Sequence, residues 1–281
     1  MYTMTRRECQ EGNGFRFAPA QGMIGRMYLI RFRIGASPAQ YGFLDGDAIG
    51  SVSGDIFGEF ARGQVVARLG EVQLLPPVQP SKVLALTVNF ADRLREAGLA
   101  APSLPQLFFK APSAVAGPGE AIRLPAQSHT VQHGAALAVV IGRRGRWVSP
   151  EMALRHVLGY TCAADVLALD IAELDQGLTR AASFDTFCPL GPAIATQVNP
   201  TELIIRSTIN GATRQMTSTH DMLFSVPQVV AFASAAMTLL PGDVILMGSP
   251  AGAGRLAAGD TAEVLIEGIG TLSNPVVNEN T

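Results

Sequence analysis

A few histidine, acidic and basic residues have side chains and spacings suited to metal binding or catalysis. His129 and His133 lie four residues apart, and with Asp165 they would form a ligand set better suited to zinc or iron than to magnesium. The alternative is that both histidines are loop or surface residues. Arg93 and Glu96 are three residues apart in a helix-prone segment, where they could form a surface ion pair. Arg93 could instead turn inward and bind a carbonyl or enolate oxygen.

Strands must position most of these side chains. Residues 135–142 (AALAVVIG) form an uninterrupted apolar run that indicates a central strand, and His133 and Gly134 should point to opposite faces of it. The segment from Phe90 to Gly98 favours a helix that ends at the glycine. Ser149 followed by Pro150 predicts a helix start, with the helix running to about Leu158. Further strands are expected over 82–86, 107–110, 160–166, 201–209, 244–247 and 261–267, and a further helix over 226–237.

Three parts can be distinguished along the chain. Residues 1–26 are expected to form a flexible N-terminal extension. Residues 27–77 should form a small β-rich domain, because two apolar runs flank an Asp-Gly turn at Asp45-Gly46-Asp47 and a proline-rich linker follows. Residues 78–281 then form the larger second domain.

Composition excludes several classes of function. The net charge is −2 and no long basic block occurs, so nucleic acid is not an expected partner. No apolar run is long enough for a membrane helix, and the first residues lack the apolar core of a secretory signal. Cys9, Cys162 and Cys188 are odd in number and irregularly spaced, which argues against a disulfide framework or a zinc ribbon. A reducing, cytoplasmic setting fits best.

Four stretches in the second half carry a family resemblance. They are 183–192 (SFDTFCPLGP), 221–226 (DMLFSV), 240–252 (LPGDVILMGSPAG) and 266–272 (IEGIGTL). In order and spacing they resemble the fumarylacetoacetate hydrolase family, and the resemblance extends over about residues 27–277. It implies a strand-dominated α+β fold, with a mixed β-roll after a small β-rich N-terminal domain, and a homodimer. It also implies metal-assisted chemistry on 1,3-dicarbonyl compounds or 2-keto acids.

The sequence departs from this family at the metal site. Gly134 and Ala136 stand where the family places two metal-binding glutamates, and only the third ligand is kept, as Asp165. A hard divalent cation such as magnesium needs several oxygen ligands, so one carboxylate is insufficient. We therefore expect no family-type magnesium or manganese, and no other cofactor.

The other site positions follow the same trend. In the lid segment after Phe90, Glu96 is kept but Arg93 replaces the family's histidine, and arginine cannot act as a base near neutral pH. Three further polar positions of the family have become apolar, namely Leu169, Ala172 and Ala182. Three polar residues are kept, namely Lys110, Gln215 and Ser249. A kept scaffold with a neutralised site predicts a larger, more apolar pocket.

These features favour a metal-independent enzyme acting on an apolar carbonyl-containing small molecule. Isomerisation, cyclisation or a pericyclic step would fit, with secondary metabolism as a setting. The catalytic candidates are Lys110, Asp165, Glu96 and Arg93; the substrate-binding candidates are Phe90, Gly134, Ala136, Leu169, Ala172, Ala182, Gln215 and Ser249. Two alternatives stay open: a non-catalytic binding or partner subunit, and an ordinary metal-dependent hydrolase or decarboxylase.

Overall fold

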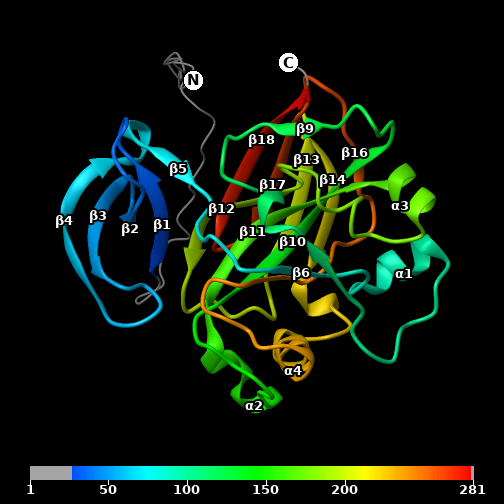
Figure 1. Cartoon of the computed structure of the whole chain (residues 1–281), viewed down its shortest axis with the longest axis horizontal. Coiled ribbons are helices and arrows are strands. Elements are labelled where there is room, and N and C mark those ends of the chain that lie inside the picture. Colours follow the sequence, from blue (N-terminus) through cyan, green and yellow to red (C-terminus); the bar gives the residue numbers. More distant parts are fainter. Residues whose placement is uncertain (1–26, 280–281) are drawn as a thin grey trace, which may run out of the picture.

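Two β-sheets form the framework of the molecule (Figure 1). The computed structural model describes residues 27–279. The larger sheet runs in the spatial order β4 (Phe60–Arg68), β3 (Ala48–Gly54), β2 (Gln40–Asp45), β1 (Tyr28–Arg33), β12 (Cys188–Ala195), β11 (Val157–Ala168), β10 (Val131–Ile141), β15 (Val244–Leu246), β6 (Val83–Leu86) and β7 (Leu107–Lys110). Off this path lie β5 (Gln73–Leu75), β8 (Val115–Ala116) and β16 (Gly254–Arg255). The second sheet runs β14 (Ala212–Ser218), β13 (Ile204–Ile209), β17 (Thr261–Ile266), β18 (Gly270–Asn278) and β9 (Ile122–Leu124).

Helices are short in the described residues. They are α1 (Ala91–Ala97), α2 (Pro150–Ala153), α3 (Leu169–Asp175) and α4 (Val226–Ala236), with 3-10 turns η1 (Leu69–Glu71), η2 (Pro112–Ala114), η3 (Leu154–His156) and η4 (Thr219–Asp221). The strand-dominated fold expected from the sequence is confirmed. The helix that we expected to reach Leu158 stops at His156, because the long strand β11 begins at Val157. Between residues 27 and 279, the helices all fall short of the length and apolarity that crossing a bilayer requires.

The larger sheet curls into a roll. Strands β10, β15 and β6 separate β7 from β11, yet Lys110 at the end of β7 donates a hydrogen bond to the Val166 carbonyl of β11, with Nζ and the oxygen 3.0 Å apart. Strand β8, which follows β7 after one turn, pairs with β12. The far edge of the sheet is thereby brought back beside β11 and β12, so the interior of the roll is enclosed on most sides.

Strand β10 is the central strand that the apolar run indicated, and it is longer than expected. It pairs with β11 on one side and with β15 and β16 on the other. Nearly all of its residues are buried, which is typical of a strand covered on both faces. Its register places Gly134 opposite Asp165 and Ala136 opposite Ala163, so these four residues share one face.

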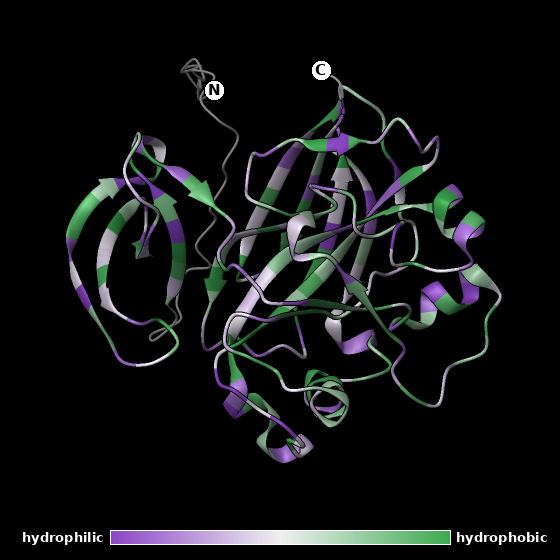
Figure 2. Ribbon diagram, viewed as in Figure 1, coloured by the Kyte–Doolittle hydropathy of each residue, from purple (hydrophilic) through white to green (hydrophobic). Residues whose placement is uncertain are grey.

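The N-terminal strands continue the same sheet. Strand β1 pairs with β12 through Tyr28–Ala195 and Leu29–Ile194. The expected hairpin around Asp45-Gly46-Asp47 is present as β2 and β3. These strands carry bands of both polar and apolar residues (Figure 2). Ile30, Phe32, Leu44 and Ile49 form a small core with Leu74 of β5 and Ala193 of β12. Because Ala193 lies on β12, this small core joins the N-terminal strands to the roll. The extension over residues 1–26 lies outside the described residues.

Candidate active site

A buried ion pair between Lys110 and Asp165 lies inside the roll. Lys110 Nζ is 2.7 Å from Asp165 Oδ1, and the two side chains are 0% and 6% exposed. The ammonium also donates to the Val166 carbonyl and lies 5.9 Å from the centre of the Phe108 ring. Each charge is compensated by its partner, which is the condition under which two ions can be buried together. The structure therefore joins two of the predicted catalytic residues directly.

Cys188 borders this ion pair, which the sequence did not indicate. Ala163 pairs with Leu190, so Cys188, two residues along β12, faces the same side as Asp165. Burial raises the pKa of the Cys188 thiol to about 12, and the nearby Lys110 opposes that shift only in part. The thiol is therefore protonated and a poor nucleophile at neutral pH. Predicting that Cys188 lies beside the ion pair would have required the register of β12 against β11, and the periodicity of a strand does not give that register.

Ser249 occupies the space in front of Gly134. A Cβ atom added at residue 134 would lie 2.2 Å from Ser249 Oγ and 2.9 Å from Ser249 Cβ. Ala136, opposite Ala163, is 0% exposed. The larger pocket that we expected from the loss of two glutamates is thus not what the structure shows at Gly134, because the Ser249 side chain fills the vacated volume.

Gln215 fixes Ser249 and ties the two sheets together. Its Oε1 accepts hydrogen bonds from the Ala135 N–H at 2.7 Å and from Ser207 Oγ at 3.0 Å. Its Nε2 donates to Ser249 Oγ at 2.9 Å and to the Pro250 carbonyl at 2.7 Å. All of its amide groups are engaged, so Gln215 positions Ser249 rather than offering a free group to a substrate. Ser249 Oγ accepts this bond and donates to no other group within residues 27–279.

Helix α1 lies over the turn that carries Ser249. Glu96 Oε1 accepts a hydrogen bond from the Gly252 N–H at 3.0 Å, and its other oxygen pairs with Arg93. Burial raises the pKa of Glu96, but the bonds from Arg93 and Gly252 outweigh that effect and hold the pKa below its usual value. The expected ion pair between Arg93 and Glu96 is present within α1. The bond from Gly252 to Glu96 joins the helix to the turn that carries Ser249.

Buried contacts hold the start of α1. Asn89 is fully buried; its Nδ2 donates to the carbonyls of Phe224 and Met247, and its Oδ1 accepts from the Phe224 N–H at 2.8 Å. Phe90 is also 0% exposed and forms an isolated bridge with Met222. Phe90 was predicted to bind substrate, whereas the structure places it in the core as an anchor. Asn89 shares this anchoring role, which its neighbourhood in the sequence did not reveal.

The remaining apolar candidates lie on and after α3. Leu169 and Ala172 are half-buried on the helix, and the Leu169 N–H donates to the Thr130 carbonyl at 2.8 Å. Ala182 has no exposed surface. Ala136, Ala182 and Phe90 therefore contribute packing rather than accessible surface.

The two histidines are not brought to Asp165. His129 is an exposed loop residue, as one of our readings held. The same reading is wrong for His133, which lies in β10 and is 0% exposed, on the opposite face from Gly134. Neither of its ring nitrogens has a hydrogen-bond partner in the described part of the chain. Burial lowers the pKa of His133 to about 4, so the ring is neutral at physiological pH.

The donor set at Asp165 does not fit the family's divalent metal. Gly134 and Ala136 offer no ligand atoms, and the Asp165 carboxylate already bonds to the Lys110 ammonium. Within residues 27–279, no three His, Cys, Asp or Glu residues are grouped as metal ligands would be. Magnesium and manganese prefer several oxygen ligands, and a cation at Asp165 would also face the charge of Lys110.

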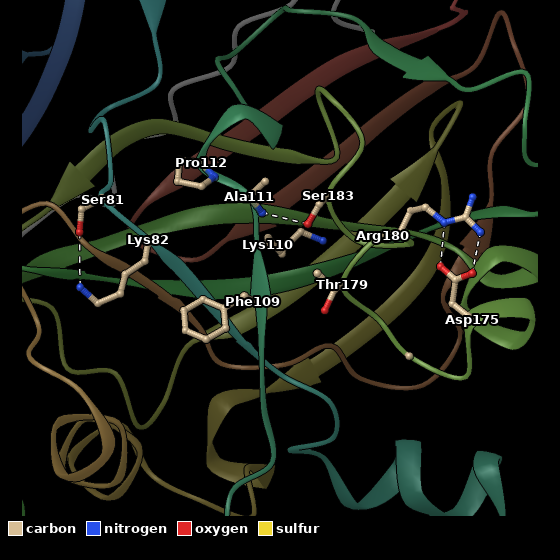
Figure 3. A pocket seen from close by; sticks show the side chains of 11 residues that line it. Ser81, Lys82, Phe109, Lys110, Ala111, Pro112, Asp175, Thr179, Arg180 and Ser183 are labelled. Atoms are coloured by element: carbon tan, nitrogen blue, oxygen red, sulfur yellow. Dashed lines mark hydrogen bonds and ion pairs between the residues drawn. The ribbon is translucent and has the colours of Figure 1, made fainter.

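An open cavity of about 660 Å³ adjoins the outer side of β7 (Figure 3). Phe109 and Thr179 line it, together with Arg180, whose guanidinium donates to both oxygens of Asp175. Lys110 belongs to its wall, but the Lys110 ammonium is fully buried against Asp165. The cavity thus lies beside the ion pair without exposing it.

Comparison with known proteins places this geometry in a family. Residues 82–277 match the family model described as fumarylacetoacetate hydrolase, C-terminal, and residues 27–77 match one described as Rv2993c-like, N-terminal. The chain belongs to the fumarylacetoacetate hydrolase family. As a family member it has the expected β-roll preceded by a small β-rich N-terminal region.

Several relatives of this family member have names or structures. Protein Rv2993c of Mycobacterium tuberculosis is 44% identical over 75% of this chain and 81% of its own length. The oxaloacetate tautomerase fahd2 of Xenopus laevis is 38% identical over 76% of this chain and 71% of its own length. The crystal structure of a 5-carboxymethyl-2-hydroxymuconate delta-isomerase from Mycobacterium smegmatis has a TM-score of 0.84 and 39% identity, covering 90% of this chain and 100% of that one. The chain thus shares its family with enzymes named as a tautomerase and an isomerase.

Proposed function

We propose that this member of the fumarylacetoacetate hydrolase family is an isomerase-type enzyme that moves a proton on an apolar, carbonyl-containing small molecule without a divalent metal at Asp165. The observation that carries the proposal is the ion pair of Lys110 with Asp165, because it neutralises the one retained ligand carboxylate from within the chain. The names of the tautomerase and isomerase relatives support the reaction class. A homodimer, a cytoplasmic location and a role in secondary metabolism belong to the same proposal.

The polar groups of α1 and the Ser249 turn can supply the steps. Glu96 is ionised at neutral pH and about two-fifths exposed, so it can take a proton from the carbon beside a carbonyl and return it to the other end of the enolate. The Ser249 hydroxyl can donate to the enolate oxygen, since its own oxygen is held by Gln215. Arg93 beside Glu96 adds a positive charge near that oxygen. The proton is conserved overall and no co-reactant is needed.

Proton exchange in heavy water tests the proposal directly. Oxaloacetate and a panel of apolar β-dicarbonyl compounds would be incubated with the enzyme in D2O, and deuterium incorporation would be followed by NMR, with and without EDTA. We expect enzyme-dependent exchange that EDTA leaves unchanged and that Glu96→Gln lowers by about a hundredfold. Glu202→Gln, an exposed carboxylate on another part of the surface, is the matched control and should keep full activity. Exchange that disappears with EDTA and returns with magnesium or manganese would refute the metal-independent reaction.

Binding without turnover is a second candidate function. Gln215 is fully engaged, and Arg93 and Glu96 are paired with each other, so these three residues are satisfied without a substrate. A compound that raises the melting temperature of the protein but never exchanges its protons would favour this second function.

A further inference from the structure

Trp147, the chain's single tryptophan, is displayed at the surface in an unusual backbone conformation. Trp147 is 76% exposed, and its backbone φ is 53°. A bulky residue in the left-handed region costs about 1 kcal/mol or more. Burial returns little of that cost here, because most of the indole remains in contact with water. The fold therefore gains little from a tryptophan at this position.

The turn around Trp147 is nevertheless held firmly. The Trp147 N–H donates to the Ser234 carbonyl at 3.0 Å, and the Val148 N–H donates to Ser234 Oγ at 2.9 Å. Arg146 Nη1 donates to the same Ser234 carbonyl and to that of Ala235, while the Arg146 guanidinium lies 4.3 Å from the centre of the Trp147 ring. The last turn of α4 thus fixes both the backbone and the stacked guanidinium, so the indole is presented in one orientation.

The segments next to Trp147 carry exposed basic and apolar residues. The His156 carbonyl at the end of η3 accepts hydrogen bonds from the N–H groups of Gly142 and Arg143, so η3 lies beside the start of the loop that carries Trp147. Gly145 also forms a bridge with Leu239. We call the resulting surface the Trp147 patch. It comprises the exposed residues Arg143, Arg144, Trp147, Met152, Leu154, Arg155 and Leu240. It lies on the lower side of the molecule in Figure 1, at α2 and α4, away from α1 and α3.

The charge of the Trp147 patch is opposite to that of the chain. Residues 143–156 contain four arginines and one acidic residue, Glu151, whereas the whole chain has a net charge of −2. Exposed tryptophan and arginine are the residue types most enriched among the energetically important residues of protein interfaces. We propose that the Trp147 patch docks an acidic peptide segment of a partner protein, with an apolar side chain of that segment packed on the indole.

Two other occupants fit less well. A second copy of this chain related by two-fold symmetry would set the arginines of one patch against the same arginines of the other. A lipid surface is usually bound by a long amphipathic helix, whereas α2 is a single turn of four residues that also carries the acidic Glu151. An acidic peptide satisfies both the arginines and the exposed apolar side chains.

The fluorescence of Trp147 provides a site-specific test, because no other tryptophan contributes. The full chain would be titrated with a synthetic peptide of Glu and Asp residues containing one Phe and one Leu, and separately with phosphatidylglycerol vesicles. Its emission would also be measured at increasing protein concentration. We expect a blue shift of emission with the acidic peptide alone, weakened by salt. Arg144→Glu should weaken binding by about tenfold or more, whereas Arg206→Glu, the same change at an exposed arginine of β13, should not.

A second variant separates docking from folding. Trp147→Asn places a residue that tolerates positive φ, so its melting temperature should equal or exceed that of the parent chain. Its affinity for a labelled acidic peptide, measured by anisotropy, should fall by about tenfold or more. A blue shift with vesicles or on self-association instead of with the peptide would overturn the proposal, as would the absence of any shift. A stable Trp147→Asn variant with unchanged peptide affinity would also overturn it.

Discussion

Lys110 and Asp165 form an ion pair that is buried inside the roll. Both could be named as candidates from the sequence because the family resemblance keeps them, Asp165 as the third metal ligand and Lys110 as a retained polar residue. The sequence did not allow their contact to be foreseen, since three strands separate β7 from β11 in the sheet. The contact arises from the curl of the sheet, which is a property of the whole sheet rather than of either segment.

Removing one partner of this pair should be far worse than removing both. Lys110→Met leaves the Asp165 carboxylate buried without a counter-charge, and we expect a loss of about 3–5 kcal/mol in the free energy of unfolding. The double variant Lys110→Met/Asp165→Asn should recover a large part of that loss. Urea denaturation of both variants and of the parent would measure the coupling. A cost below about 1 kcal/mol for Lys110→Met would show that the ion pair does not stabilise the roll.

His133 should make stability depend on pH. Its pKa is lowered from 6.5 to about 4 by burial, so the folded protein keeps the ring neutral where the unfolded chain takes up a proton. The contribution of neutral His133 to the free energy of unfolding is fully present above pH 6.5 and is lost as the pH falls towards 4. The loss amounts to about 3 kcal/mol. Urea denaturation at several pH values would compare the parent with His133→Gln, in which this component should be absent. Parallel pH curves for the two proteins would contradict the prediction.

Gly134 and Ser249 should be coupled. Gly134→Ala places a methyl group 2.2 Å from Ser249 Oγ, so the serine must move and its bond with Gln215 must break. We expect a loss of about 1–3 kcal/mol in the free energy of unfolding. Ser249→Gly on its own removes the obstructing side chain. The double variant should therefore lose less free energy of unfolding than the two single variants lose together. Strictly additive losses would argue against the contact.

Helix α1 is an element that the sequence described well, because its glycine stop and its Arg93–Glu96 spacing are local features. The position of the helix could not be read in the same way. It depends on Asn89 bonding to Phe224 and Met247 and on Glu96 bonding to Gly252, and these partners lie more than a hundred residues away. Helix α3 was missed as a helix, since its seven residues follow a long apolar strand without a strong start signal.

The glycine at the end of α1 should control how firmly the helix closes over the Ser249 turn. Gly98 has a φ of 65° and no atom near its missing side chain, so Gly98→Ala costs only backbone strain. We expect α1 to be destabilised by about 1 kcal/mol, with faster hydrogen exchange at its amides and little change elsewhere. Gly70→Ala is the control, because Gly70 is equally unobstructed but has no positive φ. Equal effects of the two changes would contradict this role for Gly98.

At the scale of the whole molecule, the N-terminal strands and the roll share one sheet. The β1–β12 pairing and the core around Ala193 connect them, as does the bond from Tyr28 Oη to the Gly268 carbonyl at 3.2 Å. The apolar runs that flank the Asp-Gly turn at Asp45-Gly46-Asp47 predicted these strands and their hairpin. They could not predict that β12 accepts β1 as a neighbour, because that pairing joins residues more than 160 positions apart.

We expect the two regions to unfold together. Native-state hydrogen exchange should give the amides of β1 and β12 similar opening free energies, since each strand is a ladder partner of the other. The edge strand β4, which is exposed along most of its length, should exchange more readily and serves as the internal control. Much faster exchange throughout β1 than in β12 would show that the N-terminal strands open independently.

The cross-strand pairing of Gly134 with Asp165 also constrains how this sequence could change over generations. Replacing Gly134 by glutamate would collide with Ser249 and would set a second carboxylate directly opposite Asp165. The nearby ammonium of Lys110 is already committed to Asp165, so the new charge would lack a partner. Restoring a metal-binding carboxylate here thus requires several substitutions that are each unfavourable alone. Under the proposed metal-independent reaction, a lineage carrying this site would regain a metal only through combined changes, and its activity would not vary with the supply of magnesium or manganese in the cell.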